Sequence, residues 1–214
     1  PVRALTPTPI PTQLPRHTPS PSPTASPPPL FQGAYTLFRS ADQLWIQSPN
    51  QAAVQLSPLP LLANPHLVAL SPNQQWLAWV GGNPGYQGLT LFIWDTQTAQ
   101  IIHSQTLVPQ LKTAQNEVDY DTAFDAALAI GELGTLAWRA DSHLLAFSAA
   151  FHTLDSDLYV WQANQPVERI SKEQGQAVQA SWQGQTLLWQ VVQIPPDPAP
   201  WQEYLILAHS SWEK

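Results

Sequence analysis

Short apolar runs alternate with polar turns along most of the chain after residue 31. The runs are rich in Trp, Tyr, Phe, Val and Ile, and they are bounded by Pro, Asn, Asp, Gly and Ser. Runs this short are typical of β-strands joined by hairpins. Three segments align without gaps, each as a polar turn followed by an apolar stretch ending in an aromatic residue: 70–79, 138–147 and 180–189. A second apolar run follows each of them, at 89–95, 156–162 and 203–209.

The spacing of the aligned segments indicates a repeat. Ser71 and Arg139 occupy the same position in two copies and lie 68 residues apart, whereas Arg139 and Ser181 lie 42 apart. A period of about 40–45 residues with about four strands per unit is the signature of a β-propeller. The longer spacing indicates an insertion of roughly 25 residues at about 106–133. Within it, 122–132 is the only segment of the chain with a helical pattern.

The strand pattern predicts four units, with three, four, four and three strands. The first unit has strands at 34–40, 43–49 and 52–57 and lacks the usual first strand, and the last ends after its third. Closed propellers have typically four to eight blades. We therefore predict an all-β chain, a β-propeller with about four repeat units that is an incomplete part of a larger propeller. The end sheets are then expected to expose apolar side chains, such as those of 205–207.

The units resemble the TolB-like, WD-related β-propeller repeats of bacterial exported proteins. That motif has a Trp-Ser-Pro-Asp-Gly turn, then Leu-Ala-Phe, then a Leu-Tyr-Val strand. The matching segments are 71–73 with 77–79, Trp138 and Asp141 with 145–147 and 157–160, and 181–184 with 187–189. The chain departs from the motif because it has no intact Ser-Pro-Asp-Gly turn and no Gly-His dipeptide. The resemblance implies the fold of residues 31–214, but it does not specify a ligand.

Residues 1–30 differ in composition from the rest and contain 11 of the 23 prolines, mixed with Thr and Ser. Proline removes backbone donors and fixes φ, so we predict a disordered, polyproline-II-like tether. A tether ahead of a propeller is similar to the stalk of propeller lipoproteins of environmental bacteria. We expect an extracytoplasmic location (cell surface, periplasm or secreted), with a signal peptide or lipid anchor upstream of residue 1 as a possible membrane tether. An inter-domain linker in a larger cytosolic protein is the alternative.

Charge and composition exclude several classes of function. The net charge of −7 argues against a nucleic-acid partner, because such proteins need a basic surface. The absence of Cys excludes disulfides and thiolate metal sites. No run approaches 18 consecutive apolar residues, the minimum for a membrane-spanning helix.

Two segments have the composition of binding loops. The glycine-rich segment 81–88 lacks the Gly-Lys-Ser/Thr ending of a phosphate loop, so it is interpreted as a flexible hairpin loop. The acidic stretch with Glu117, Asp119, Asp121 and Asp125 offers oxygen ligands for Ca²⁺ but has no EF-hand spacing. A solvated insertion loop leading into a helix is the favoured interpretation, and inserts of this kind often lie over a propeller rim where ligands bind.

Histidine, serine and aspartate residues raise the question of catalysis. The candidates for a hydrolytic triad are Ser148, His143, His152, Asp155 and Asp157, but no Gly-x-Ser-x-Gly elbow accompanies them. The histidines show no His-x-x-x-His pair, which argues against zinc. The tryptophans Trp79, Trp94, Trp161 and Trp189, together with Phe147, recur at equivalent positions and are expected to pack between blades. Trp201 and Trp212 fall outside that register and are the candidates for exposed rings.

The sequence therefore predicts a non-enzymatic, extracytoplasmic β-propeller module that binds a protein or a glycan at the cell surface. It assigns no catalytic, cofactor-binding or metal-binding residue and expects no cofactor. The alternative function is the propeller segment of a larger hydrolase, such as a prolyl-oligopeptidase-like peptidase, with its catalytic domain outside this chain. A lipid-anchoring signal upstream favours the first function, and a Gly-x-Ser-x-Gly elbow downstream favours the second.

Overall fold

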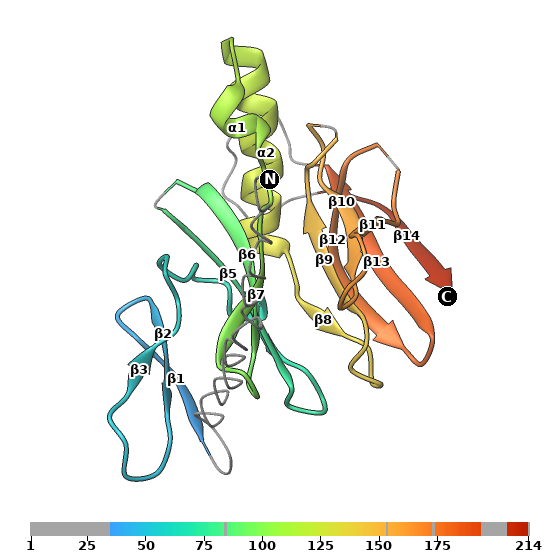
Figure 1. Ribbon diagram of the computed structural model, residues 1–214. Helices are drawn as coiled ribbons and strands as arrows, with labels where there is room; N and C mark the ends of the chain where they lie inside the picture. The colour runs from blue at the N-terminus through green and yellow to red at the C-terminus, as the bar shows by residue number, and fades with distance from the viewer. Residues whose placement is uncertain (1–34, 84, 153, 173, 194–204, 214) are drawn as a thin grey trace, which may run out of the picture.

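The chain forms four small antiparallel sheets arranged as an arc, which is the architecture of a partial β-propeller (Figure 1). The computed structural model describes residues 35–83, 85–152, 154–172, 174–193 and 205–213. The predicted tether and Trp201 lie outside these described residues. Strands account for 46% and helices for 15% of the structure, so the predicted all-β class is confirmed. No helix among the described residues is long and apolar enough to cross a bilayer.

Each sheet, called a blade below, is an up-and-down meander, and within the described ranges the predicted count of three, four, four and three strands is confirmed. Blade 1 comprises β1 (Thr36–Ser40), β2 (Gln43–Gln47) and β3 (Val54–Gln55). Blade 2 comprises β4 (Val68–Leu70), β5 (Trp76–Asn83), β6 (Gln87–Asp95) and β7 (Gln100–Thr106), preceded by the short helix η1 (Pro65–Leu67). Blade 3 comprises β8 (Ala137–Trp138), β9 (Leu145–Ala149), β10 (Asp157–Trp161) and β11 (Glu168–Arg169). Blade 4 comprises β12 (Gln176–Gln183), β13 (Thr186–Gln193) and β14 (Leu205–Glu213).

The two middle blades are apolar on both faces, because successive side chains of a strand point to opposite neighbours. In blade 2, Val80 and Ile93 pack toward blade 3, whereas Trp79 stacks on Phe92 on the face toward blade 1. The aromatic positions predicted to lie between blades are all buried, which confirms that expectation: Trp79, Trp94, Phe147, Trp161 and Trp189. Interlocking apolar faces therefore form the core.

A tryptophan on the innermost strand joins each of the last two blades to the blade before it. The indole Nε1 of Trp138 in β8 donates to the carbonyl of Ala69 in β4 at 3.1 Å. In the same way, Nε1 of Trp182 in β12 donates to the carbonyl of Ala137 in β8 at 3.0 Å. These bonds satisfy the indole N–H groups while the rings cover the seam between blades.

Trp138 and Trp182 also correct the gapless alignment of the sequence repeats. Trp138 pairs with Leu145 across its hairpin, and Trp182 pairs with Leu187. Trp182 is therefore the structural equivalent of Trp138, and the turn of blade 4 is two residues shorter. The shorter turn places the tryptophan two positions later in the repeat, which a gapless comparison of sequences misses.

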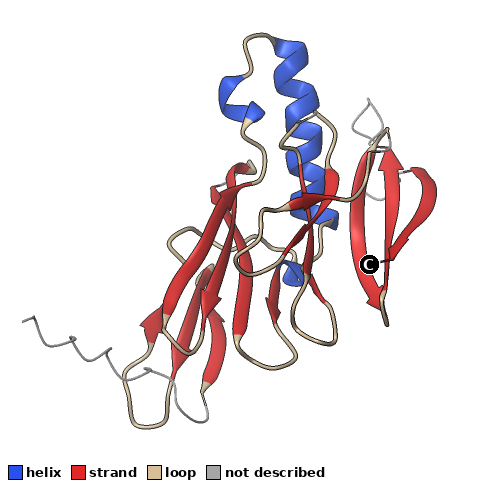
Figure 2. Ribbon diagram, turned by 45° about the vertical axis from the view of Figure 1, so that its right-hand side comes forward, coloured by secondary structure: helices blue, strands red, loops and turns tan. Residues whose placement is uncertain are grey.

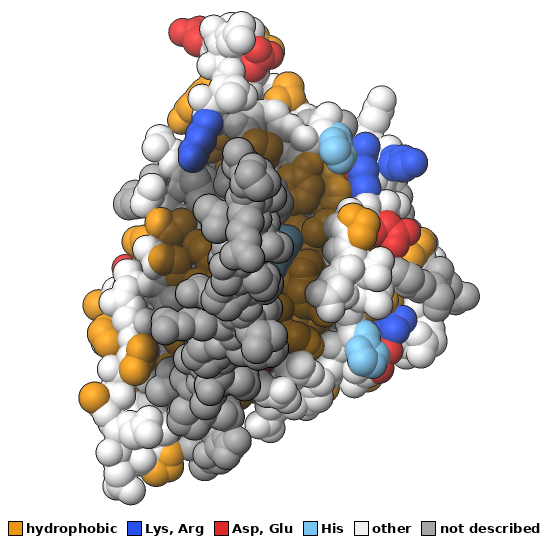
Figure 3. All heavy atoms as spheres, viewed as in Figure 1, with side chains coloured by type: hydrophobic (Ala, Val, Ile, Leu, Met, Phe, Trp, Pro, Cys, Tyr) orange, Lys and Arg blue, Asp and Glu red, His pale blue; other side chains and the backbone are white. Residues whose placement is uncertain are grey.

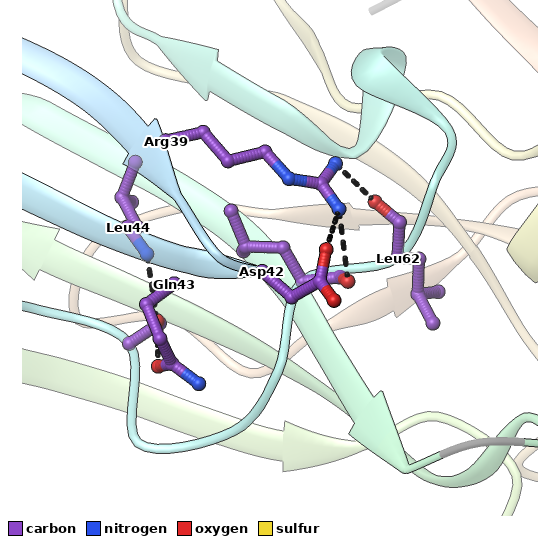
Figure 4. Close-up of polar contacts among 7 residues, drawn as sticks. Arg39, Asp42, Gln43, Leu44 and Leu62 are labelled. Carbon is purple, nitrogen blue, oxygen red and sulfur yellow. Dashed lines mark hydrogen bonds and ion pairs between the residues drawn. The ribbon is translucent and has the colours of Figure 1, made fainter.

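Blade 1 is held to blade 2 by a different group, the guanidinium of Arg39 in β1. Arg39 donates through Nη1 to the carbonyl of Leu62 at 2.9 Å and forms an ion pair with Asp42 (Figure 4). Leu62 lies on the segment that connects the two blades. Beneath this contact, Leu44 and Ile46 bury their side chains against blade 2.

The end sheets of the arc are those of blades 1 and 4. The first and last sheets share no strand pairing among the described residues and lie at opposite ends of the arc (Figures 1 and 2). On blade 4, the face opposite the one packed on blade 3 is mixed in its described part: Ser181, Gln183, Thr186 and Gln190 lie on it with Leu188 and with the buried Val178 and Val192, which pack against Ala129 of the inserted segment. The side chains of 205–207 lie outside the described residues. Trp212 is half-buried against Trp182 at 6.2 Å, so the expected exposed ring is wrong.

Two helices fill the insertion between β7 and β8: α1 (Gln110–Thr113) and α2 (Glu117–Leu133). The predicted helix at 122–132 is thus too short, and the acidic stretch is helical rather than a loop. Asn116 caps α2 by accepting the N–H of Asp119 at 2.8 Å, and the acids of the first turn interact favourably with the helix dipole. Ala126, Ala127 and Ile130 bury the other side of α2 in the core between blades 2 and 3.

The glycine-rich segment is mostly strand, which corrects the predicted loop. Gly81 and Gly82 lie in β5 and Gly88 in β6. Gly81 is required by close packing, since a Cβ there would lie 2.9 Å from the Cβ of Leu59. The tip turns through Gly85, where φ is +74°, and places Tyr86 against α2.

Removing an indole N–H tests the hydrogen bond that joins Trp182 to the preceding blade. We expect Trp182→Phe to lower the free energy of unfolding by about 1–3 kcal/mol, because the carbonyl of Ala137 loses its donor at a covered seam. Urea denaturation followed by fluorescence measures the change. An unchanged midpoint and slope would show that the bond does not contribute.

Substitution of Gly131 tests how α2 is seated on blade 2. A glycine inside a helix is normally about 1 kcal/mol less favourable than alanine. Here an added Cβ collides with the ring of Tyr86, so we expect Gly131→Ala to destabilise the protein. In a Tyr86→Ala background the same substitution is expected to stabilise it. Thermal unfolding of the four proteins gives the answer, and the same sign in both backgrounds contradicts this seating.

Candidate functional site: a groove beside the inserted helix

The insertion rises from the rim of the blades, with α2 standing beside blades 2 and 3 (Figures 1 and 2). Acidic side chains gather at its projecting end (Figure 3). Because helical residues turn by about 100° each, Tyr120 and Asp125 project from nearly opposite sides of α2. A groove lies on each of these sides. The one with two carboxylates is called the acidic groove below.

The acidic groove has a volume of about 420 Å³ and lies between α2 and the adjoining edges of blades 3 and 4. Thr122 and Asp125 contribute from α2, and Asp155 from the β9–β10 hairpin loop. Three glutamines from the edges of blade 4 add amide groups: Gln174, Gln176 and Gln193. The described residues that line it include no Lys, Arg or His.

A buried amide orients the carboxylate of Asp155. Gln176 is only 5% exposed, and its Oε1 accepts the N–H of Ser156 at 2.7 Å. Its Nε2 donates to Oδ1 of Asp155 at 3.2 Å, and the N–H of Gly175 approaches Oδ2 at 3.5 Å. The carboxylate is therefore held in place at the groove by groups that are themselves anchored in blade 4.

Asp125 is the electrostatically unfavourable member of the groove. Partial burial raises the pKa of its carboxyl above the ordinary value of 3.8, and the negative charges of Asp121 and Asp155 raise the pKa further. It makes no hydrogen bond or ion pair with the described residues. A positive group entering the groove would relieve this repulsion.

The triad candidates are not brought together. Asp157 is buried in an ion pair with Arg169 and accepts a hydrogen bond from Ser171, so it has a structural role. His143 lies in the turn between β8 and β9, and the buried hydroxyl of Ser148 contacts no histidine among the described residues. The described residues also hold no cluster of three metal-ligating side chains.

Sequence reasoning identified Asp125 and Asp155 as candidates, but for unrelated sites. The fold brings them to one groove although 30 positions separate them. It missed Gln174, Gln176 and Gln193, since isolated glutamines in turns and strand ends carry no motif. Glu117, Asp119 and Asp121 remain on the outer part of α2 and do not line this groove.

Comparison with known proteins yields likeness of fold at low sequence identity. No family model matches the chain, and no curated protein matches it. TolB from Acinetobacter baumannii is similar with 10% identity and a TM-score of 0.42, over 77% of this chain and 34% of TolB. The β-propeller domain of the trilobed protease from Pyrococcus furiosus has 13% sequence identity and a TM-score of 0.47, and the match covers 84% of this chain and 51% of that protein. A prolyl endopeptidase has 9% sequence identity and a TM-score of 0.44, and the match covers 82% of this chain and 29% of the endopeptidase. The chain thus spans at most about half of each of these proteins.

All three likenesses have TM-scores below 0.5 and concern the fold alone. A propeller fold by itself does not specify a function.

The raised pKa of Asp125 has a consequence for stability. Its ionised form is disfavoured by folding, so folding stability falls as the pH rises above 3.8. We expect Asp125→Asn to raise the melting temperature at about pH 7, where the charged carboxylate of Asp125 is less stable in the folded chain than in the unfolded chain. No such rise is expected at about pH 3, where the carboxyl is protonated in both the folded and the unfolded chain. Scanning calorimetry at the two pH values tests this. An equal change at both values would contradict the electrostatic origin.

Proposed function

We propose that the chain is a non-enzymatic, extracytoplasmic β-propeller module that binds a partner protein. The acidic groove takes a Lys or Arg side chain of that partner. The observation that carries the proposal is the partly buried carboxylate of Asp125, which shares a groove with Asp155 and with no basic lining residue. A cation placed there forms charge-assisted hydrogen bonds, which are about twice as strong as neutral ones.

The amide groups of the groove suit the same ligand. An ammonium or guanidinium group has several N–H donors, and the side-chain oxygens of Gln174 and Gln193 can accept those that the carboxylates leave free. The described residues contain no group of three or more His, Cys, Asp or Glu side chains that could hold a metal ion. We therefore propose a side-chain cation rather than a metal ion as the ligand.

The composition of residues 1–30 supports the extracytoplasmic part of the proposal. A Pro/Thr/Ser-rich segment is a spacer that holds a domain away from a surface, and a chain without Cys needs no reducing compartment. We expect a protease to cleave the protein when it is added to intact cells or to cells in which only the outer envelope has been permeabilised. Protection under both conditions, with cleavage only after the cytoplasmic membrane is lysed, would contradict this location.

Binding of two matched peptides tests the groove. The probes are acetyl-Gly-Lys-Gly-amide and its norleucine analogue, which has the same aliphatic chain without the charge. We expect the lysine peptide to shift the NMR signals of Thr122, Asp125 and Gly175, with a dissociation constant of about millimolar order. The norleucine peptide is expected to leave these signals unchanged.

Variants locate the effect within the groove. Asp125→Asn combined with Asp155→Asn is expected to abolish the shifts, whereas Glu117→Gln, on the exposed first turn of the same helix, is expected to retain them. Binding of both peptides, or binding that survives the double substitution, would contradict the proposal. Hydrolysis of the lysine peptide by the protein would contradict its non-enzymatic part and favour the hydrolase alternative.

A further inference from the structure

The groove on the opposite side of α2 has different chemistry. It lies between the insertion and the β5–β6 hairpin of blade 2 and has a volume of about 390 Å³. That volume is within the range of about 300–1,000 Å³ that is typical of small-molecule sites. Its polar lining comes from Tyr120, Asn83, Gln87, Thr90 and Lys112. It is called the amide groove below.

Tyr120 offers the groove an aromatic platform. The residue is 41% exposed, which is high for a large hydrophobic side chain. It stacks on Phe124 with 6.2 Å between ring centres and 12° between planes. Phe124 in turn meets the edge of Tyr86 at 6.3 Å. The platform is thus supported from within the protein, which limits the entropy lost when a ligand covers it.

The two walls of the groove are fixed to each other. The ring of Tyr86, at the tip of the β5–β6 hairpin, lies directly against Gly131 of α2. Its hydroxyl donates to the carboxylate of Glu132. The hairpin therefore cannot drift from the helix without losing both contacts, and the groove is preformed.

Two side-chain amides face the groove from the hairpin. Asn83 and Gln87 are directly paired across β5 and β6 at the last ladder position before the tip. Neither side-chain amide makes a hydrogen bond with the described residues, so each has a donor and an acceptor available. Thr90 donates its hydroxyl proton to the carbonyl of Gly88 at 2.8 Å, which leaves its oxygen free to accept.

These groups match the surface of a sugar ring. A sugar presents a face of C–H groups, which packs on an aromatic ring, and an edge of hydroxyls, which pairs with amides that donate and accept. Among the described residues that line the groove there is no carboxylate, and the one charged side chain is that of Lys112. A lysine-bearing peptide is therefore favoured by the acidic groove and not by this one.

We propose that the amide groove binds a saccharide, with one sugar ring stacked on Tyr120 and its hydroxyls bonded to Asn83 and Gln87. Lys112 gives the groove a preference for an acidic sugar over a neutral one of the same size. This site is independent of the protein-binding function proposed above, since it uses other residues on the other side of α2.

A glycan array containing neutral and uronate-bearing oligosaccharides tests the proposal. We expect uronate-bearing oligosaccharides to bind more tightly than neutral ones of the same size, and the tightest to shift the NMR signals of Tyr120, Asn83 and Gln87. Absence of binding to every saccharide on the array would overturn the proposal. So would binding whose shifts fall only outside the amide groove.

Substitution of the platform separates stacking from folding. We expect Tyr120→Ala to weaken glycan binding at least tenfold and Tyr120→Phe to change it less than threefold, because stacking needs the ring and not the hydroxyl. Asn83→Ala and Gln87→Ala are expected to weaken it about tenfold each. Val118→Ala, at an exposed position on the other side of α2, is the matched control and is expected to bind normally. Equal binding by Tyr120→Ala and the unaltered protein would overturn the proposal.

The two proposals fail separately. Asp125→Asn with Asp155→Asn is expected to leave glycan binding unchanged, and Tyr120→Ala to leave binding of the lysine peptide unchanged. Loss of glycan binding in the first variant would place the sugar in the acidic groove and contradict the assignment to the amide groove.

Discussion

The hydrogen bond from an inner-strand tryptophan to the carbonyl of the preceding blade sets the geometry of the arc. Trp138 and Trp182 each reach back to the inner strand of the blade before, and each covers a seam with its ring. A blade of three or four short strands cannot bury its faces alone, so its stability comes from its neighbours. The bond fixes the distance and angle at which apolar faces meet. Between blades 1 and 2, where the described residues show no such tryptophan, Arg39 donates to the carbonyl of Leu62 on the connecting segment, and Leu44 and Ile46 pack against blade 2.

The same geometry positions the candidate sites. Because blades 2 and 3 are packed face to face, the connection between them can carry an insertion without disturbing the core, and α2 stands on their shared rim. Its small residues allow close packing against both blades. The helix then divides the rim into one groove with carboxylates and one groove with amides and an aromatic ring. Two chemically different surfaces thus arise from a single inserted element.

Strands were predictable from the sequence because hydrophobic alternation and turn residues are local signals, and every blade assignment agrees with the structure. The helix was predicted too short because its start depends on the Asn116 cap rather than on apolar periodicity. Gly81 was assigned to a loop from the sequence, but glycine is needed there because Leu59, 22 positions away, leaves no room for a Cβ. Pairing across the hairpins, not sequence alignment, reveals that Trp182 corresponds to Trp138.

The sites were less predictable than the fold. Asp125 and Asp155 come together only through tertiary structure. Tyr120 was not identified, because the segment that contains it was interpreted from its acidic residues. Nothing local marks Asn83 and Gln87 as partners, since their relation depends on the register of a hairpin tip. Prediction of such grooves needs the positions of the blades first, and those positions depend on the indole bonds.

Hydrogen exchange of the indole N–H groups tests the central role of these bonds most directly. NMR in D₂O can follow Trp138 and Trp182 beside Trp76, which is half-buried and has no indole hydrogen bond to the described residues. The account predicts that the protons of Trp138 and Trp182 exchange only through global unfolding, with the free energy measured by denaturation, while that of Trp76 exchanges much faster. Exchange of Trp138 and Trp182 as fast as that of Trp76 would contradict it.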